Sequence, residues 1–417
     1  MMIPRRSLLG AAAFAAARSQ AQGPAASDKL NLAGVGIGAM GAGYLEACAS
    51  ENIVALADVD DVFAAKTFAK YPQAARYRDW RKLLEREKSV DGVIIATPDH
   101  THAEIALAAI ALGKHVYCAK PMTHTIEQAR AVTRAAREKR VATQMSVQSC
   151  ASEDACATEE WVRSGALGTV REVHTWSDRP VWPQGMVRPE RAVNPPSTLA
   201  WDIWLGSAPK RPFHPIYHPF NWRGWYDFGT GALGDMGCHT LHIIFRALQL
   251  PPPLSASASS NFTMIPASSQ EADQPWMRAK TLKTPETFPH ASSVVWDFPG
   301  GVRVFWYDGG WKPPRPQLLD AEAELPRTGL LFVGDKGTLL SGFSGGRSRL
   351  LPESKFKDAP PPAKTVARSI GHYQEWINAC KGGPAPNCNF EFGSLLTETA
   401  LLGVEAIRTG KTVRWRS

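Results

Sequence analysis

The sequence lacks paired cysteines. Its seven cysteines are an odd number and include no two spaced as C-x-x-C. An odd number of cysteines with no such pair argues against a disulfide framework. We therefore expect most of these thiols to be small buried side chains. The sequence therefore predicts a fold held by its apolar core and not by disulfide bonds.

Blocks of consecutive basic residues are also missing, although the formal net charge is +8. The Lys and Arg residues are scattered, and no nucleic-acid-binding motif accompanies them. Proteins that bind nucleic acid usually gather their cations in one patch or stripe. We therefore predict no nucleic-acid partner. Hydrophobic residues make up 44% of the 417 residues, which is enough for a sizeable core, and chains of this length usually form two or three domains.

No stretch is long and apolar enough to span a membrane, which takes about 20 residues. The apolar run at residues 8–17 is shorter, follows Arg5 and Arg6, and precedes a small-residue sequence at 19–21. This pattern is typical of a signal peptide, and Arg-Arg-Ser-Leu-Leu resembles a twin-arginine signal; an ordinary Sec signal is the alternative. We predict a signal peptide and linker at 1–27, and folded export to the periplasm or the outside of the cell.

The segment from 28 to 150 alternates between two patterns. Apolar, strand-like runs begin near residues 30, 52, 92 and 114, and segments of helical spacing lie between them. Such alternation is typical of parallel βαβ units, so the sequence predicts an α/β fold with a doubly wound Rossmann domain. Thr125 followed by Gln128 predicts a capped helix start.

Past residue 150 the pattern changes to a Trp- and Pro-rich stretch and then to hairpin-like strands with glycine turns. This predicts a C-terminal α+β domain over 151–417, with a large open, mainly antiparallel sheet. Two helical segments close the chain, and they could pack back on the first domain.

A glycine fingerprint, G-x-G-x-x-G, follows the first strand and opens a helix, and an acidic residue ends the next strand. The first glycine makes a tight turn, the second lets a pyrophosphate approach the backbone, and the third lets the helix pack on the strand. The helix N-terminus favours the phosphates. This acidic residue would accept hydrogen bonds from a ribose diol and repel a 2′-phosphate, which favours NAD over NADP. The predicted cofactor-binding residues here are Gly36, Ile37, Gly38, Met40, Gly41 and Asp58.

Two further strands end in residues suited to the same crevice, because the carboxyl ends of parallel strands line it. The first ends in Thr97-Pro98-Asp99-His100, and the second in Lys120-Pro121. His100 and His102 are close enough to suggest a metal, but zinc takes three or four ligands and no Cys, Asp or Glu cluster accompanies them. We therefore predict no metal and assign Thr97, Pro98, His100, His102, Lys120 and Pro121 to cofactor binding.

At these residues the sequence resembles a known family. The glycine fingerprint, "ATPDHTHAE", "KHVYCAKPM" and "GALGDMGCHTL" occur in the order and spacing of the glucose–fructose oxidoreductase / inositol dehydrogenase (Gfo/Idh/MocA) family. The resemblance implies an N-terminal Rossmann domain, a C-terminal α/β domain with an open sheet, sugar or polyol substrates, and a homodimer or homotetramer built on that sheet. Ala119 and His242 stand where the family often has acidic residues.

The resemblance places the family's catalytic lysine on Lys120 and its Asp-x-x-x-His pair on Asp235 and His239. Oxidation of an alcohol needs a base for the hydroxyl proton, and a histidine has a suitable pKa. Lys120 can stabilise developing oxyanion charge, while Asp235 can orient the imidazole. A capped helix start with buried histidines is the alternative interpretation of "GDMGCHTLH".

The Trp-rich stretch is the predicted carbohydrate site, because aromatic faces suit the C–H faces of sugars and Arg suits hydroxyls or carboxylates. Loop packing is the alternative for each aromatic residue. The predicted substrate-binding residues are Trp176, Arg179, Trp182, Trp222 and Arg223.

Together these features predict an exported NAD(P)-dependent oxidoreductase that transfers hydride between a carbohydrate CH–OH and a tightly held nicotinamide. Two alternatives stay open. One is redox-assisted glycoside hydrolysis, as in NAD-dependent α-N-acetylgalactosaminidases; the other is a sugar- or nucleotide-binding protein with weakened catalysis.

Overall fold

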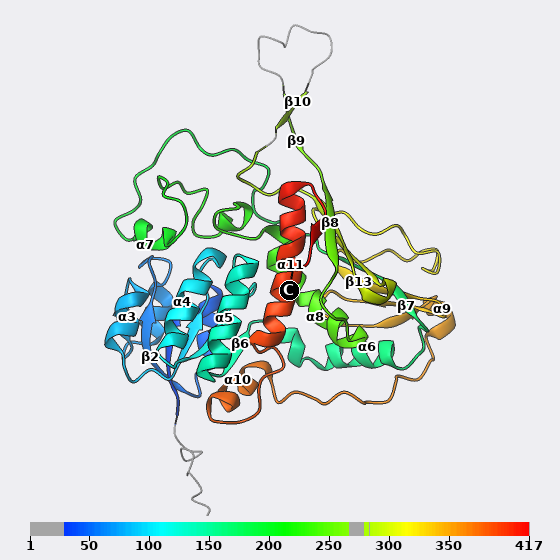
Figure 1. Cartoon of the computed structure of the whole chain (residues 1–417), viewed down its shortest axis with the longest axis horizontal. Helices are drawn as coiled ribbons and strands as arrows, with labels where there is room; N and C mark the ends of the chain where they lie inside the picture. The colour runs from blue at the N-terminus through cyan, green and yellow to red at the C-terminus, as the bar shows by residue number, and fades with distance from the viewer. Residues whose placement is uncertain (1–28, 267–278, 283, 417) are drawn as a thin grey trace, which may run out of the picture.

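The computed structural model describes residues 29–266, 279–282 and 284–416, so the predicted signal peptide at 1–27 lies outside the described residues. Two large sheets form the body of the molecule, with the long C-terminal helix α11 between them (Figure 1). The predicted combination of a Rossmann-type parallel sheet and a second, mainly antiparallel sheet is confirmed.

The first sheet has six parallel strands in the order β3-β2-β1-β4-β5-β6. Because β1 pairs with both β2 and β4, the strand order reverses beside β1, and ligands bind at such a switch point in doubly wound sheets. The strands are β1 (Asn31–Val35), β2 (Asn52–Ala57), β3 (Ala75–Tyr77), β4 (Gly92–Ile95), β5 (His115–Cys118) and β6 (Thr143–Met145). Their crossover helices are α1 (Met40–Ala47), α2 (Ala65–Lys70), α3 (Trp80–Arg86), α4 (Asp99–Ala111) and α5 (Ile126–Lys139).

The helix start predicted at Thr125 is confirmed. The Thr125 side chain accepts a hydrogen bond from the backbone N–H of Gln128, and the Gln128 side chain accepts one from the N–H of Thr125. This reciprocal pair satisfies two N–H groups that a helix N-terminus leaves free. It fixes where the chain turns into α5 after the Lys120 loop.

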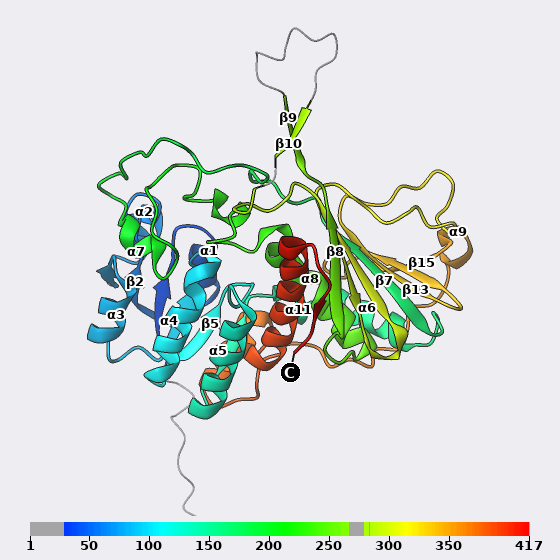
Figure 2. The same cartoon turned by 45° about the horizontal axis from the view of Figure 1, so that its top comes forward.

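The second sheet has eight strands in the order β15-β14-β13-β7-β12-β11-β8-β16. Only β7 and β12 pair in parallel; their neighbours all run antiparallel. Figure 2 shows these strands fanning out beside α8 and α11. The bounds are β7 (Val170–Trp176), β8 (Ser255–Ser260), β11 (Ser292–Asp297), β12 (Arg303–Tyr307), β13 (Gly329–Gly334), β14 (Thr338–Ser341), β15 (Arg349–Leu351) and β16 (Val413–Arg414).

The remaining elements surround this sheet and its junction with the first. The strands β9 (Thr263–Pro266) and β10 (Ala279–Leu282) pair in a separate hairpin that projects from the body (Figures 1 and 2). The other helices are α6 (Glu153–Arg163), α7 (Trp201–Leu205), α8 (Gly231–Leu248), α9 (Glu353–Phe356), α10 (His372–Cys380) and α11 (Phe390–Thr409).

The two terminal helices pack against the first domain. In α10, Trp376 is fully buried in a cluster with Leu32, Ile94 and Tyr117 from the parallel sheet. In α11, the Thr397 hydroxyl accepts a hydrogen bond from the backbone N–H of Met122, just after the Lys120 loop. These contacts hold the end of β5 in a fixed position relative to the second domain.

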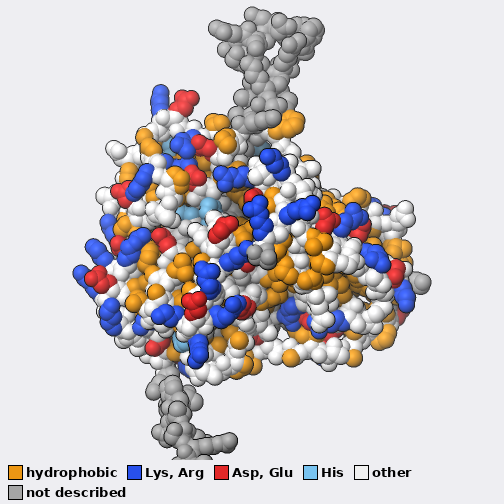
Figure 3. All heavy atoms as spheres, in the orientation of Figure 1, with side chains coloured by type: hydrophobic (Ala, Val, Ile, Leu, Met, Phe, Trp, Pro, Cys, Tyr) orange, Lys and Arg blue, Asp and Glu red, His pale blue; other side chains and the backbone are white. Residues whose placement is uncertain are grey.

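Charge is dispersed over the face of the molecule that Figure 3 shows. On the face in Figure 3, Lys and Arg side chains alternate with Asp and Glu, and no large area carries one sign. All seven cysteines are free, and six of them are buried. Among the helices of the described residues, none combines the length and apolarity needed to cross a membrane.

Candidate active site

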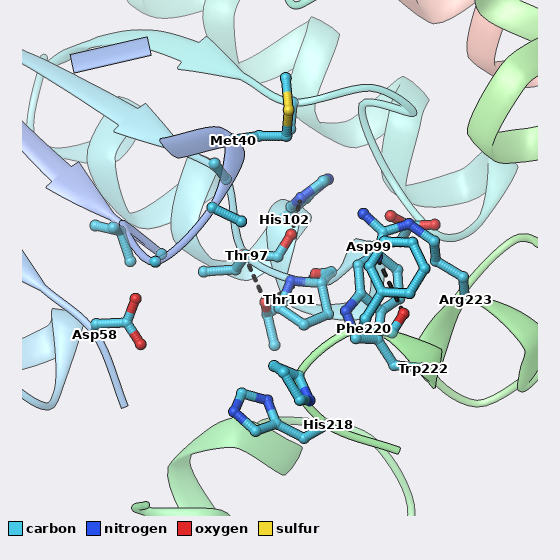
Figure 4. A pocket seen from close by; sticks show the side chains of 18 of the residues that line it. Met40, Asp58, Thr97, Asp99, Thr101, His102, His218, Phe220, Trp222 and Arg223 are labelled. Carbon is cyan, nitrogen blue, oxygen red and sulfur yellow. Dashed lines mark hydrogen bonds between the residues drawn. The ribbon is translucent and has the colours of Figure 1, made fainter. Parts of the chain in front are cut away.

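A pocket of about 470 Å³ lies where the carboxyl ends of β1, β4 and β5 face the Trp-rich segment and the first turns of α8. Figure 4 shows its two ends: Asp58 lies on one side, and Trp222, Phe220 and Arg223 lie on the other. The predicted cofactor-binding and substrate-binding regions therefore share one cavity.

The glycine turn fits a dinucleotide. Gly36 has a φ of +77°, and a Cβ there would lie 2.7 Å from the backbone nitrogen of Thr97. A Cβ on Gly41 would lie 2.0 Å from the carbonyl oxygen of Gly36, so only glycine lets α1 start this close to β1. The free N–H groups at the start of α1 face the same cavity, and they are suited to a pyrophosphate.

Gly38 has an unexpected neighbour. The ring of Phe63, which is 38% exposed, lies so close that a Cβ on Gly38 would be 2.1 Å from its Cδ1. The sequence predicted open space over this glycine for a pyrophosphate. A pyrophosphate can reach Gly38 only when the Phe63 ring turns aside, which its exposed position allows.

Asp58 ends β2 beside the turn, as the fingerprint predicts. Its carboxylate accepts hydrogen bonds from the backbone N–H of Ile37 (2.7 Å) and of Asp60 (3.0 Å). Burial raises the pKa of Asp58 to about 6, and those N–H groups oppose the rise. At neutral pH it is therefore mainly an anion, and each oxygen keeps a lone pair for a ribose hydroxyl.

Lys120 reaches from the end of β5 to the start of α8. Its Nζ lies 2.7 Å from Oδ1 of Asp235 and 2.5 Å from the Asp235 carbonyl oxygen. Its backbone N–H donates to the hydroxyl of Ser146, which also accepts from Tyr44 of α1. An ammonium has three N–H donors, so these contacts leave one for a ligand in the pocket. The Lys120–Pro121 peptide bond is cis.

Asp235 carries the negative charge of this group. Its Oδ1 also accepts from Nε of Arg223 at 3.3 Å. Burial alone would raise the pKa of Asp235, but the positive charges of Lys120 and Arg223 lower it to about 2. The carboxylate is therefore ionised throughout the physiological range and fixes both cations beside the pocket.

His239 lies on the pocket wall one helical turn after Asp235, on the same face of α8. Burial, together with the positive charge of Lys120, lowers the pKa of His239 to about 3. Its imidazole is therefore neutral near pH 7, and it is a weak base as long as it is buried beside the Lys120 ammonium. His242, a further turn along, points elsewhere and contacts the hydroxyl of Ser149 at 2.9 Å.

Asp99 is a pocket residue to which the sequence reasoning gave no role. It opens α4, is 3% exposed, and accepts a hydrogen bond from the Thr230 hydroxyl at 2.6 Å. Burial raises its pKa to about 6, while that hydrogen bond and the charge of Lys120 oppose the rise. Asp99 follows the same strand as Thr97, and ligands lie at the carboxyl ends of such strands. The sequence could therefore have assigned Asp99 to the site by the same rule.

The two histidines considered for a metal do not converge. The ring nitrogens of His100 face the carbonyl oxygens of Phe228 and Trp204. Those of His102 face the carbonyls of Pro121 (2.9 Å) and Thr97 (2.7 Å), so His102 links the loops that follow β5 and β4. Within the described part of the chain, no three His, Cys, Asp or Glu side chains gather in a way that could hold a metal ion.

Several predicted site residues do line the pocket. They are Gly36, Gly38, Met40, Asp58, Thr97, Pro98, His102, Lys120, Arg179, Trp182, Trp222, Arg223, Asp235 and His239. Ile37, Gly41, His100 and Pro121 do not line it, but they shape the turns that do.

Trp176 lies away from the pocket, contrary to the prediction of a sugar contact. Its indole is fully buried in a cluster with Leu319, Leu331 and Leu340, and its Nε1 donates to the carbonyl of Pro326. The loop-packing alternative is therefore the correct interpretation for Trp176.

His218, a plausible pocket residue on sequence grounds but one without an assigned role, lines the cavity. Phe220 and Tyr44 also line it, and the sequence reasoning did not select either. Tyr44 reaches Ser146 across 102 positions of sequence, a separation at which no local pattern operates.

Two models of one family match the chain. The NAD-binding Rossmann fold of this oxidoreductase family matches residues 30–147, and its C-terminal alpha/beta domain matches residues 165–250. The dinucleotide-binding half of the pocket thus belongs to an NAD-binding fold, which agrees with the cofactor predicted from the sequence.

Curated relatives are similar over part of their length. Levoglucosan dehydrogenase of Pseudarthrobacter phenanthrenivorans is 26% identical over 211 residues, which cover 51% of this chain and 45% of that protein. Inositol 2-dehydrogenase 2 of Saccharopolyspora erythraea is 34% identical over 102 residues, which cover 24% of this chain and 30% of that protein. The chain thus matches less than half the length of these relatives.

Solved structures share the fold over almost the whole chain. The WlbA dehydrogenase of Bordetella pertussis, solved with NADH and UDP-GlcNAcA, has a TM-score of 0.63 and 16% identity and covers 93% of this chain and 99% of its own. A levoglucosan dehydrogenase solved with NADH has a TM-score of 0.59 and 17% identity, with the same coverage. Since models of one family match both domains in the order in which the two sheets occur, the chain belongs to the Gfo/Idh/MocA oxidoreductase family.

Proposed function

We propose that this protein is an NAD-dependent oxidoreductase that acts on a CH–OH group of a sugar or polyol. The observation that carries the proposal is the single pocket that joins the glycine turn to Lys120, Asp235 and His239. The relatives named as levoglucosan and inositol dehydrogenases support the same reaction class.

NAD, when bound at the glycine turn, supplies the hydride acceptor. The remaining N–H of Lys120 donates to the reacting oxygen and stabilises negative charge as it develops there. The imidazole of His239 is a weak base, but it can accept the hydroxyl proton as hydride leaves, because loss of hydride makes that proton strongly acidic. Asp235 is ionised and holds Lys120 in place, so the ammonium is positioned before the substrate arrives.

The opposite end of the pocket suits a carbohydrate. Trp182, Trp222 and Phe220 present aromatic surface there, and the Arg223 guanidinium lies 4.2 Å from the ring centroid of Trp222 and 4.5 Å from that of Phe220. Stacked between rings, this guanidinium loses little freedom when it donates to a hydroxyl. Aromatic faces with one fixed donor are typical of sugar sites.

Product analysis tests the proposal and its alternatives together. The purified protein is incubated with a panel of sugars and aryl glycosides without added cofactor. A carbonyl product, or an oxidised and a reduced sugar in equal amounts, supports the oxidoreductase. Release of the aglycone with no net oxidation supports redox-assisted glycoside cleavage instead. Binding of sugar with no product at all supports a protein that only binds its ligand.

The choice of NAD over NADP should depend on Asp58. We expect Asp58→Ala to raise the affinity for NADP relative to NAD by about tenfold or more, because a buried anion beside the ribose repels a 2′-phosphate. The wild-type preference should also weaken as the pH falls below about 6, where Asp58 becomes protonated. Titration of both nucleotides above and below that pH measures the effect. An unchanged ratio in the variant would contradict the assignment.

We also propose that the protein is exported in the folded state. The arginine pair at Arg5 and Arg6 supports twin-arginine export of the folded protein to the periplasm or cell exterior. No soluble NAD pool exists there, so the cofactor must be loaded before export and regenerated within each cycle. We expect protein recovered from the periplasmic fraction to carry close to one nucleotide per chain after gel filtration. Recovery without nucleotide, or with one that exchanges readily, would overturn the closed cycle.

The family's mode of assembly leads us to propose a homodimer or homotetramer built on the open sheet. One face of β12 in that sheet is open to solvent in part: Arg303 is exposed, and Phe305 and Tyr307 are half-buried. Light scattering in solution tests the assembly directly.

A further inference from the structure

A second hollow lies beside the active-site pocket. It is more open, has a volume of about 580 Å³, and falls in the usual range of about 300–1,000 Å³ for small-molecule sites. The side chains that matter here are those of Asp178, Trp182, Gln184, His290, Lys312 and Arg327. None of them has a role in the reaction proposed above except Trp182.

Trp182 lines both cavities, so its indole is their common wall. The side chain is held firmly: its Nε1 donates to Oε1 of Gln184 at 2.9 Å, and its ring meets Phe220 edge-to-face at 6.0 Å between centroids. The Gln184 amide is itself tied to the carbonyl of Pro289. Trp182 is 5% exposed, so it is a rigid boundary shared by the two cavities, and a ligand that occupies both would lie against it.

Asp178 forms an ion pair with one arginine from each cavity. Its carboxylate pairs with Arg179, which lines the active-site pocket, and with Arg327, which lines the second hollow; both distances are 2.7 Å. The Arg327 side chain is 84% exposed, so this pair contributes little to stability. Its other N–H groups are available to a ligand in the hollow.

Lys312 supplies further donors. Its Nζ donates to the carbonyl oxygen of Leu325 at 3.0 Å, which leaves two N–H groups for a ligand. With Arg327 and the Asp178 carboxylate, the hollow therefore offers two cationic donors and one acceptor beside Trp182. Hydroxyl-rich rings need this combination, whereas an apolar partner would leave these polar groups unpaired.

The glycine turn for the cofactor, the active-site pocket and the second hollow lie in that order. Asp58 and Trp222 lie at opposite ends of the active-site pocket (Figure 4). Trp182, which also lines the second hollow, lies at the Trp222 end, because its ring contacts Phe220 and lies 5.8 Å from the Arg223 guanidinium. We propose that the second hollow binds the sugar unit next to the one that reacts, so that the substrate is a disaccharide or a longer glycoside. This inference rests on the proposed carbohydrate function and specifies its substrate class.

The test compares binding of matched sugars. The probes are common hexoses and hexuronic acids, each alone and within one α-linked and one β-linked disaccharide, and their affinities are measured by tryptophan fluorescence and calorimetry. We expect at least one disaccharide to bind about tenfold or more tightly than the monosaccharide it contains. The double variant Lys312→Ala/Arg327→Ala should lose that preference and keep the monosaccharide affinity. The control Lys336→Ala/Lys357→Ala removes two exposed positive charges elsewhere in the same domain and should change neither.

Turnover of the same probes separates this proposal from the one on which it rests. A disaccharide preference that the double variant loses, without hydride transfer in any protein, supports the second subsite and contradicts the oxidoreductase. Hydride transfer from monosaccharides and disaccharides with equal affinity overturns the subsite alone. The subsite is also overturned if no disaccharide binds more tightly than its monosaccharide, or if the double variant keeps the preference.

Discussion

Replacing Lys120 with Met is expected to lower kcat/KM for hydride transfer by about 10³-fold, the scale on which loss of one positioned charge or proton-transfer group acts. Met keeps most of the length and the apolar stem of lysine but removes the ammonium. The variant loses the contacts to the Asp235 carboxylate and carbonyl and the one N–H left for the substrate. NAD affinity should fall much less than turnover, because the glycine turn and Asp58 are untouched and Lys120 is only one of the predicted cofactor contacts. Single-turnover reduction of the bound nucleotide measures the loss.

The matched control lies at the other end of the same strand. Lys114 precedes β5, and its Nζ donates to the carbonyl oxygen of Lys88 at an exposed position. Lys114→Met removes the same charge from the same strand and should leave kcat/KM within about twofold of wild type, as expected for an exposed site away from the reaction. If Lys120→Met retained wild-type turnover, Lys120 would have no part in the chemistry.

Gly41→Ala should weaken NAD binding strongly. The added Cβ would lie 2.0 Å from the carbonyl oxygen of Gly36 and 3.3 Å from the Cβ of Ala96. A backbone carbonyl has no flexible end to give way, so α1 must move off β1 and take the phosphate-binding N–H groups with it. We expect NAD affinity to fall by about 100-fold or more, and the free energy of unfolding of the nucleotide-free protein to fall by about 1–3 kcal/mol. Nucleotide titration and thermal unfolding measure the two effects.

Gly43 provides the control within the same helix. It lies two positions further along α1, and a Cβ there meets nothing within 4 Å. Gly43→Ala should stabilise the helix by up to about 1 kcal/mol, since Ala is the better helix former. Its NAD affinity should equal that of the wild type. If both variants bound NAD normally, the turn at Gly36–Gly41 would not be the nucleotide site.

Long periodic segments made the first domain predictable from sequence. Its four buried strands and the helices between them have apolar patterns that local physics controls, and the Thr125 cap needed only two side chains. The edge strands β3 (Ala75–Tyr77) and β6 (Thr143–Met145) were missed, because three residues are too few to show a period. The antiparallel second sheet was predicted as a class, but its parallel β7–β12 pair depends on a long crossover that no short pattern encodes.

The site was predictable where it follows strand ends and not where it depends on tertiary contacts. Lys120 and Thr97 follow from the rule that ligands lie at the carboxyl ends of parallel strands. The Trp-rich stretch could not be resolved residue by residue, because the same indole can pack or bind. Trp182 and Trp222 line the pocket, whereas Trp176 is buried under the second sheet. The Phe63 ring over Gly38 is likewise a contact between distant positions.

The central claim is that a carbohydrate C–H passes its hydrogen to a nicotinamide bound at this pocket. The direct measurement mixes NAD⁺-loaded protein with sugars deuterated at each carbinol carbon for a single turnover, quenches the reaction before hydride can return to a sugar, and analyses the nucleotide by mass spectrometry. Our account predicts deuterium in the nicotinamide ring from one carbinol position, and none with the Lys120→Met variant. Sugar binding and product formation with no deuterium ever entering the nucleotide would contradict it.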